Sequence, residues 1–200
     1  MKGKMLLLFM ALALASLTVT RTSAQQATVK VVPASLTVPN VGASFSLNIT
    51  VENVENLYAY EFKLYYPNDV LNGTKVVEGP FLKKGGTTVF AVANFTDNYN
   101  ATHGLLNVVC LSMETSSPGV NGSGTLATAT FKSTATTGPR ILHLYDVKLS
   151  DPTPASIPLT SADGEVTVVP EFPVALALPL FLVSTLLVII LRKREVNCRG

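Results

Sequence analysis

Residues 44–67 read SFSLNITVENVENLYAYEFKLYYP, and this stretch decides the fold class of the chain. Along its first half, apolar and polar side chains alternate, which is the period-two pattern of a strand with one buried and one solvent-exposed face. The apolar positions of that half are Phe45, Leu47, Ile49 and Val51. Along its second half, the same alternation sets Tyr58, Tyr60, Phe62, Leu64 and Tyr66 on one face and Ala59, Glu61, Lys63 and Tyr65 on the other. The stretch therefore predicts two successive strands, each with one face toward a core.

The same kind of pattern continues through residues 25–169, which have the length of one ordinary domain. Further strands are predicted at 27–32, 35–38, 74–78, 87–95, 105–113, 125–132, 140–149 and 164–169. Turn-forming groups stand between them, among them Asn72-Gly73, Pro118-Gly119, Gly122-Ser123-Gly124 and Gly138-Pro139. Some nine or ten short strands with this punctuation predict an all-β fold, an antiparallel two-sheet sandwich of the jelly-roll type.

The two ends of the chain predict export and a membrane anchor. Residues 1–24 carry Lys2 and Lys4 before an apolar run and end on small residues, as a cleavable signal peptide does; an uncleaved anchor helix is the alternative. Residues 172–191 contain no charge and are long enough, as a helix, to cross a hydrocarbon core. We assign 170–173 as a linker, 174–191 as a transmembrane helix and 192–200 as a basic cytoplasmic tail. The prediction is a single-pass protein of the cell membrane with residues 25–169 outside.

Charge argues against nucleic-acid binding. The chain has a formal net charge of +2, but residues 25–169 hold eight Lys or Arg against eleven Asp or Glu. The basic character therefore belongs to the ends of the chain. Because the lysines and arginines of the domain form no basic stripe in the sequence, no nucleic-acid partner is expected.

The sequence offers little for catalysis or for a metal or cofactor. The two histidines, His103 and His143, stand in no nucleophile motif, and two histidines with one cysteine do not supply a zinc site. Cys110 is expected to pack as a small apolar side chain, and Cys198 falls beyond the predicted span, so no disulfide joins them. Alternation groups His143 with Ile141, Tyr145, Val147 and Leu149, so we expect a packed or half-buried histidine. We expect a protein that is not an enzyme and that needs no cofactor.

Five N-glycosylation sequons occur in the domain, at Asn48, Asn72, Asn94, Asn100 and Asn121. Asn48 falls on the polar face of its predicted strand, and Asn72, Asn100 and Asn121 fall in predicted turns or loops. Asn94 shares its parity with apolar Phe90 and Val92, so either the strand bulges before Asn94 or Phe90 and Val92 form an outward apolar patch. The sequons predict a secreted glycoprotein.

The order of these elements from about residue 26 to 169 resembles cohesin domains, and most closely the cohesin-like modules of archaeal surface proteins. The matching pieces are SLTVPNVGASFSLNITVENVENLYAYEFKLYYP, the following Val70-Leu71, GSGTLATATF at 122–131 and the closing Asp163-Gly164-Glu165-Val166. The resemblance implies a nine-stranded jelly roll whose sheet face binds a partner module, typically a calcium-loaded dockerin. No loop of the form D-x-[DN]-x-[DN] occurs in this sequence, so the calcium would belong to the partner.

The tail resembles a second kind of signal. Pro170, Glu171 and Phe172, followed by an apolar span and Arg192-Lys193-Arg194, look like the PEF-type C-terminal sorting signals that archaeosortases process. This resemblance implies removal of the span and reattachment of the domain to the surface. A retained single-pass helix is the other possibility.

Together these features favour a non-catalytic binding module at the cell surface. The candidate partner face comprises Ala59, Glu61, Lys63 and Tyr65, joined by Phe90 and Val92. The run from Leu105 to Met113 is apolar on both parities, so one of its faces must be covered by a loop, lie in an interface or be exposed. The expected partner is a dockerin-like module, a surface-layer protein or a second copy of the chain. The alternative is a carbohydrate-binding module acting on polysaccharide, which is weakened by the absence of Trp and by only Tyr65 and Tyr99 being predicted outward.

Overall fold

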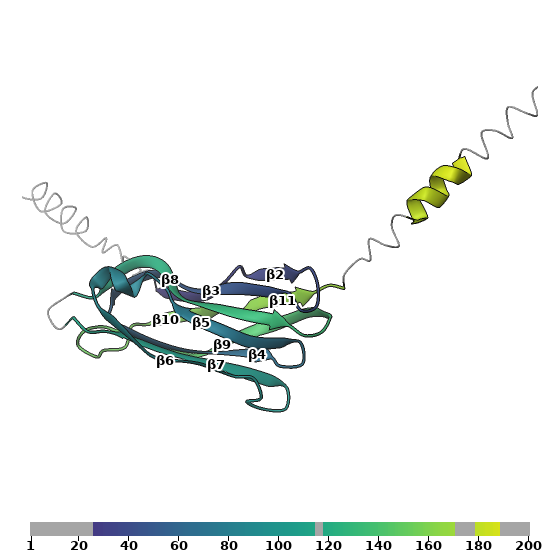
Figure 1. Cartoon of the computed structure of the whole chain (residues 1–200). Helices are drawn as coiled ribbons and strands as arrows, with labels where there is room; N and C mark the ends of the chain where they lie inside the picture. Colours follow the sequence, from purple (N-terminus) through teal and green to yellow (C-terminus); the bar gives the residue numbers. More distant parts are fainter. Residues whose placement is uncertain (1–25, 115–117, 171–178, 189–200) are drawn as a thin grey trace, which may run out of the picture.

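The computed structural model describes residues 26–114, 118–170 and 179–188 (Figure 1). The predicted signal peptide, most of the predicted linker and the basic tail lie outside these residues. The described residues form eleven strands and one short 3-10 helix, η2 (Leu82–Gly85), between β5 and β6. The prediction of an all-β two-sheet sandwich is confirmed.

The strands divide into a five-stranded and a six-stranded sheet. The five-stranded sheet has the order β10 (Leu159–Ala162), β1 (Ala27–Val32), β3 (Ser44–Leu57), β8 (Val120–Ser133) and β5 (Leu71–Glu78). The six-stranded sheet has the order β2 (Ser35–Val38), β11 (Gly164–Val168), β9 (Thr137–Ser150), β4 (Ala59–Pro67), β7 (His103–Ser112) and β6 (Thr88–Thr96). Figure 1 shows β4, β6, β7 and β9 side by side in one layer, and β3, β5 and β8 in the other.

The domain has eleven strands where nine or ten were expected; β10 is the strand that the sequence did not predict. Both ends of the domain change sheets. β1 and β2 are separated by a cis peptide bond between Val32 and Pro33, and they pair in different sheets. β10 and β11 divide in the same way at Asp163. The expectation of a wholly antiparallel sandwich was also wrong, because β1 pairs with β10, and β2 with β11, in parallel. These pairs lie at or beside the sheet edges, where short strands from the two chain ends run alongside each other.

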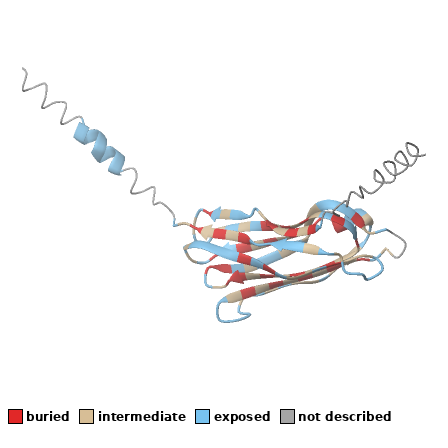
Figure 2. Cartoon of the chain, turned by 180° about the vertical axis from the view of Figure 1, so that it is seen from behind, coloured by how far each residue is buried: buried red, intermediate tan, exposed pale blue. Residues whose placement is uncertain are grey.

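The core lies between the sheets and is built by the alternation in β3 and β4. Leu47, Ile49 and Val51 of β3 are almost fully buried, as are Phe62 and Leu64 of β4. Figure 2 shows the buried positions along the strands of the sandwich, alternating with intermediate and exposed ones. All the buried hydrophobic residues of the described chain fall between Ala27 and Val168, so this segment holds a complete core.

Rings fill one part of the core. The ring centroids of Tyr66 and Phe131 are 5.1 Å apart, and those of Phe95 and Phe131 are 5.4 Å apart, both in edge-on geometry. The Tyr66 hydroxyl donates a hydrogen bond to Asp97 Oδ1 at 2.6 Å, and the same carboxylate oxygen accepts the backbone N–H of Gly73 at 2.8 Å. These contacts join β4, β5 and the loop after β6 at one end of the sandwich.

Several predicted turns lie inside strands. Asn72-Gly73 belongs to β5, Gly122-Ser123-Gly124 to β8 and Gly138-Pro139 to β9. Register shifts occur beside Gly73 and at two places along β3 opposite the start of β8. Some of the residues predicted to form turns therefore lie at β-bulges instead. As a result, Asn72 and Asn121 are exposed strand residues and not loop residues.

Beyond the sandwich, residues 179–188 are helical and exposed. The remainder of the predicted transmembrane segment 174–191 lies outside the described residues. Within the part of the chain that is described, no helix has both the length and the apolar character needed to span a membrane.

Candidate functional site

The outer face of β9, β4, β7 and β6 brings together the outward residues of β4 and those of its neighbours. Ala59, Glu61, Lys63 and Tyr65 are half-buried and point away from the core, because their chain neighbours Tyr60, Phe62, Leu64 and Tyr66 point into it. Backbone pairing sets these four residues opposite Leu111, Val109, Asn107 and Leu105 of β7, and opposite Ser150, Lys148, Tyr145 and His143 of β9. Most of the predicted partner face therefore lies on one continuous sheet surface, which we call the outer face.

One half of the outer face is apolar. Val89 and Val92 of β6 pair with Leu111 and Val109 of β7, and Ala59 continues the first of these rows on β4. Val89 is 39% exposed, and Met113 just beyond β7 is 53% exposed. The Leu105 to Met113 run is apolar on both faces. The face that does not fill the core is thus left partly open to solvent. We call the surface formed by Ala59, Val89, Val92, Val109 and Leu111 the apolar half.

Phe90 does not join this surface, which corrects the prediction. The register of β6 shifts between Val89 and Val92, so Phe90 turns inward and packs against the core while Val92 and Asn94 point outward. A one-residue bulge reverses the parity of every residue beyond it. Of the two arrangements considered for Asn94, the bulge is the one that the strand adopts.

A belt of charged side chains lies on the β4 and β9 part of the outer face. Lys63 Nζ lies 2.6 Å from Asp146 Oδ2, and Lys148 Nζ lies 3.0 Å from Asp146 Oδ1 and 3.4 Å from Glu61 Oε2. Hydrogen bonds from Lys63 and Lys148 hold the pKa of Asp146 below its ordinary value, and the same contacts raise the pKa of both lysines. The belt is neutral, so it attracts no strongly charged partner by itself.

The other half of the outer face is aromatic. The Tyr65 ring lies 5.6 Å from the Tyr99 ring, 5.6 Å from the Tyr145 ring and 6.1 Å from the His103 ring, measured between centroids. His143 extends the group, with its ring 6.4 Å from that of Tyr145. We call these five residues the Tyr65 cluster. Tyr99 and Tyr145 are each 50% exposed, so the rings are open to solvent.

Hydrogen-bonding groups surround the Tyr65 cluster. His143 Nδ1 lies 2.8 Å from Asp163 Oδ2, and His103 Nδ1 lies 2.8 Å from the Thr102 hydroxyl. A hydrogen bond with Tyr99, with a smaller contribution from burial, raises the pKa of Tyr65. Tyr65 is therefore a neutral phenol at physiological pH.

The prediction that His143 shares a face with Val147 and Leu149 was wrong. The side chain of His143 is 53% exposed, whereas Leu149 is buried and Val147 packs against the core. The cause is a second bulge, in β9, where Asp146 has a left-handed φ of 50° and the pairing with β4 shifts by one residue. The bulge turns His143 and Tyr145 outward together, and so adds rings that the alternation pattern had assigned to a packed set.

Asn107 lies at the centre of the outer face, between Lys63 of β4 and Asn94 of β6. Its Oδ1 is covered by neighbouring atoms and accepts no hydrogen bond from the described residues. A buried hydrogen-bond acceptor without a donor lowers the stability of the folded state. The hydrogen-bonding capacity of Asn107 is therefore less well satisfied than that of the residues around it.

The sequons lie on both sides of the molecule. Asn94 is exposed on the outer face, and Asn100, in the loop after β6, is also exposed. Asn48 of β3 and Asn72 of β5 belong to the opposite sheet, where Thr128 donates a hydrogen bond to Asn48 Oδ1 at 2.7 Å. Asn121 of β8 is exposed and accepts the backbone N–H of Asn56 at 2.6 Å. Glycosylation of these residues stays a prediction.

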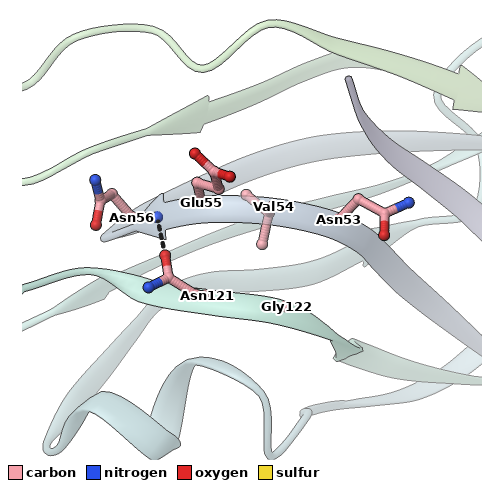
Figure 3. A pocket seen from close by; sticks show the side chains of 6 residues that line it. All are labelled: Asn53, Val54, Glu55, Asn56, Asn121 and Gly122. Carbon is pink, nitrogen blue, oxygen red and sulfur yellow. Dashed lines mark hydrogen bonds between the residues drawn. The ribbon is translucent and has the colours of Figure 1, made fainter. Parts of the chain in front are cut away.

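A separate open hollow lies where β3 and β8 are irregular (Figure 3). It is lined by Asn53, Val54, Glu55, Asn56, Asn121 and Gly122. Asn53 and Asn56 have left-handed φ values of 54° and 55°, so the hollow follows from the local twist of the strand. The lining has a single carboxylate, and nowhere among the described residues do three or more His, Cys, Asp or Glu gather to hold a metal ion.

Cys110 is buried beside a polar group inside the sandwich. Its Sγ lies 3.5 Å from Glu78 Oε1, and Glu78 also accepts a hydrogen bond from Thr88 and pairs with Lys83. Burial, the largest cause, raises the pKa of the Cys110 thiol to about 12. The thiol is therefore protonated and unsuited to act as a nucleophile.

The described domain is thus a β-sandwich module with an open sheet face and without a catalytic arrangement among its described residues. A family profile described as Cohesin domain matches residues 29–168, so the chain belongs to the cohesin family. Cohesin domains are non-catalytic protein-binding modules, which agrees with the expectation that the chain is not an enzyme. Comparison with curated proteins finds no match.

Solved structures share the fold at low identity. A non-cellulosomal cohesin from Archaeoglobus fulgidus has a TM-score of 0.54 and 19% identity, with 72% of this chain and 91% of that chain covered. The third ScaC cohesin of Acetivibrio cellulolyticus, solved with the ScaB dockerin, has a TM-score of 0.60 and 16% identity, with 72% and 99% covered. The seventh ScaB type I cohesin of Pseudobacteroides cellulosolvens has a TM-score of 0.56 and 21% identity, with 74% and 95% covered. At these identities the likeness establishes the fold alone.

Proposed function

We propose that this chain is a cell-surface attachment module whose apolar half binds a dockerin-like protein module. The observation that carries the proposal is the open apolar surface formed by Ala59, Val89, Val92, Val109 and Leu111 on a rigid sheet. Exposed contiguous apolar surface on a sheet supported by a packed core is typical of a protein interface. Several of the similar cohesins were solved in complex with dockerins, which supports the same class of partner here.

The proposed interface has a simple energetic basis. Burial of apolar surface contributes about 25 cal/mol per Å², and the sheet backbone needs little rearrangement before it binds. The charged belt beside the apolar half pairs its own charges, so a partner meets it without leaving an isolated buried charge. Calcium, where it is required, belongs to the partner.

The module is proposed to act outside the cell, held at the membrane. This part of the proposal rests on the signal-peptide pattern of residues 1–24 and on the apolar segment 174–191 with its basic flank. Retention of that segment, or its removal at the Pro170-Glu171-Phe172 signal, both leave the domain on the outer surface.

A matched pair of substitutions tests the interface. Val89 and Val77 are each 39% exposed and lie on edge strands, but Val89 is on the outer face and Val77 is on the outside of the opposite sheet. The full chain, in zwitterionic detergent, is used to capture proteins from a surface extract, and the captured protein is identified and purified. Its affinity for the wild type, Val89→Asp and Val77→Asp is then measured with and without chelator.

We expect Val89→Asp to weaken binding at least about tenfold, because a buried carboxylate would have no partner. Val77→Asp is expected to bind like the wild type, and the chelator is expected to abolish binding by unfolding the calcium loops of the partner. Equal affinity of the two variants would refute the placement of the interface. Binding that persists with chelator would point to a surface-layer protein or a second copy of the chain in place of a dockerin-like module.

A further inference from the structure

We propose that the Tyr65 cluster is a separate subsite that binds pyranose rings of a polysaccharide. The inference is independent of the protein partner proposed for the apolar half. It rests on five rings that gather on one surface from β4, β7, β9 and the loop after β6. Single exposed rings are ordinary on protein surfaces, but a contiguous group of them indicates a binding site.

The rings are available to a ligand. Tyr99 and Tyr145 keep half of their surface exposed, and the side chain of His143 is 53% exposed. These side chains pack mainly against one another and against Tyr65, not into the core. Tyrosine offers a large rigid surface that loses little side-chain entropy when a ligand covers it.

The chemistry of the Tyr65 cluster suits a sugar better than an aliphatic side chain. The face of an aromatic ring carries partial negative charge, which attracts the polarised C–H groups on the flat side of a pyranose. The hydroxyl groups around the edge of that pyranose need hydrogen-bond partners, and His143 with Asp163, His103 with Thr102 and Lys63 with Asp146 supply them around the rings. The apolar half of the same face has aliphatic side chains and no such ring of polar groups.

The arrangement of the rings favours a chain of sugars over a single one. Tyr65 lies between Tyr99 and Tyr145, with both centroid distances at 5.6 Å and ring planes tilted by 41° and 37°. Consecutive pyranose units of an extended polysaccharide are spaced at a comparable distance. An oligosaccharide could therefore cover several rings at once, and binding is expected to strengthen with chain length until the Tyr65 cluster is covered.

Along β4, the charged residues Glu61 and Lys63 lie between Ala59 of the apolar half and Tyr65 of the cluster. On β7 and β6, Asn107 and Asn94 continue the Lys63 row. Substitutions at Val89 and at Tyr99 or Tyr145 can therefore disturb a bound protein and a bound sugar one at a time. Failure of one proposal is therefore distinguishable from failure of the other.

The test titrates oligosaccharides into the full chain in a sugar-free zwitterionic detergent. The protein is produced in a bacterial host without N-glycosylation, so that no glycan at Asn100 can occupy the neighbouring rings. The probes are the hexasaccharides of β-1,4-linked glucose, mannose and N-acetylglucosamine, with the corresponding monosaccharides as references. The chain contains no Trp, and three of its six tyrosines belong to the Tyr65 cluster. A change in tyrosine fluorescence that is lost in Tyr99→Ala and Tyr145→Ala therefore reports on the cluster, and calorimetry gives the affinity.

We expect at least one hexasaccharide to bind, more tightly than its monosaccharide, and Tyr99→Ala and Tyr145→Ala each to weaken it at least about fivefold. Val77→Asp, on the opposite sheet, should bind the sugar like the wild type. Val89→Asp should lose the protein partner and keep the sugar.

Three results would overturn the proposal. The first is no saturable binding of any hexasaccharide up to about 10 mM. The second is binding that Tyr99→Ala and Tyr145→Ala leave unchanged. The third is loss of the protein partner in both tyrosine variants while no sugar binds, which would assign the rings to the protein interface.

Discussion

Gly104→Ala is predicted to destabilise the domain strongly although it adds one methyl group. Gly104 of β7 lies directly opposite Tyr66 of β4, and a Cβ built on Gly104 would lie 2.3 Å from Cε2 and Cζ of the Tyr66 ring. That ring is fully buried against Phe131, and its hydroxyl is bonded to Asp97. The ring therefore has no free space into which it can move.

The expected magnitude follows from three contributions. Overpacking of this kind costs about 1–3 kcal/mol. Displacement of the Tyr66 hydroxyl from Asp97 would leave a buried polar group unpaired, at a further cost of about 1–3 kcal/mol. Replacing glycine stiffens the unfolded chain and returns about 0.4–1 kcal/mol. The net loss in unfolding free energy is about 1–6 kcal/mol, centred on about 3 kcal/mol, and that central value lowers the Tm of a domain of this size by about 6–12 °C.

The assay is thermal and urea unfolding of a fragment spanning residues 26–170. Unfolding is monitored by near-ultraviolet circular dichroism. Gly138→Ala is the matched control, because nothing lies within 4 Å of a Cβ at that position; it should stay within about 0.5 kcal/mol of the wild type. If Gly104→Ala and Gly138→Ala melt together, the close packing of Tyr66 on β7 is not what holds this end of the sandwich.

Three further predictions concern buried and charged groups. Burial raises the pKa of the Cys110 thiol to about 12. A disulfide reagent at pH 8 should therefore label the fragment only in denaturant. Fast labelling of the native fragment would contradict the burial of Cys110. Tyr60 donates a hydrogen bond to the buried carbonyl of Leu126 at 2.6 Å, so Tyr60→Phe should cost about 1–3 kcal/mol in urea unfolding, and a neutral effect would show that the carbonyl finds another donor. Lys63 and Lys148 hold the pKa of Asp146 below its unfolded value, so the stabilisation is present above about pH 4 and is lost as the pH falls through the native pKa. The difference in unfolding free energy between the wild type and Asp146→Asn should therefore shrink in acid, and a difference that stays constant from neutral pH into acid would exclude this linkage.

The alternation in residues 44–67 was enough to predict the sandwich and the inward and outward sides of its central strands. Leu47, Ile49 and Val51 are buried, and Phe62 and Leu64 are buried on the paired sheet, as the period-two pattern requires. Side chains of a regular strand must alternate whatever the neighbouring strand is, so this information is local. The outward positions of Ala59, Glu61, Lys63 and Tyr65 follow from the same rule.

The division of the strands between the two sheets could not be predicted in the same way. β1, β2 and β11 match ranges predicted from the sequence, whereas β10 was not predicted. The division of β1 from β2, and of β10 from β11, between the two sheets depends on which strands they meet. Parallel pairing of the first and last strands joins segments more than a hundred residues apart, and no local pattern encodes it.

The sequence by itself determined the all-β class, the one-domain core and the parity of β3 and β4, because these depend only on hydrophobic alternation along the chain. The tertiary structure alone decided which rings and valines share the outer face. A bulge at Asp146 turned His143 and Tyr145 outward, and a bulge between Val89 and Val92 turned Phe90 inward. A bulge is a mismatch of one residue between two paired strands, so it exists only once the partner strand is in place.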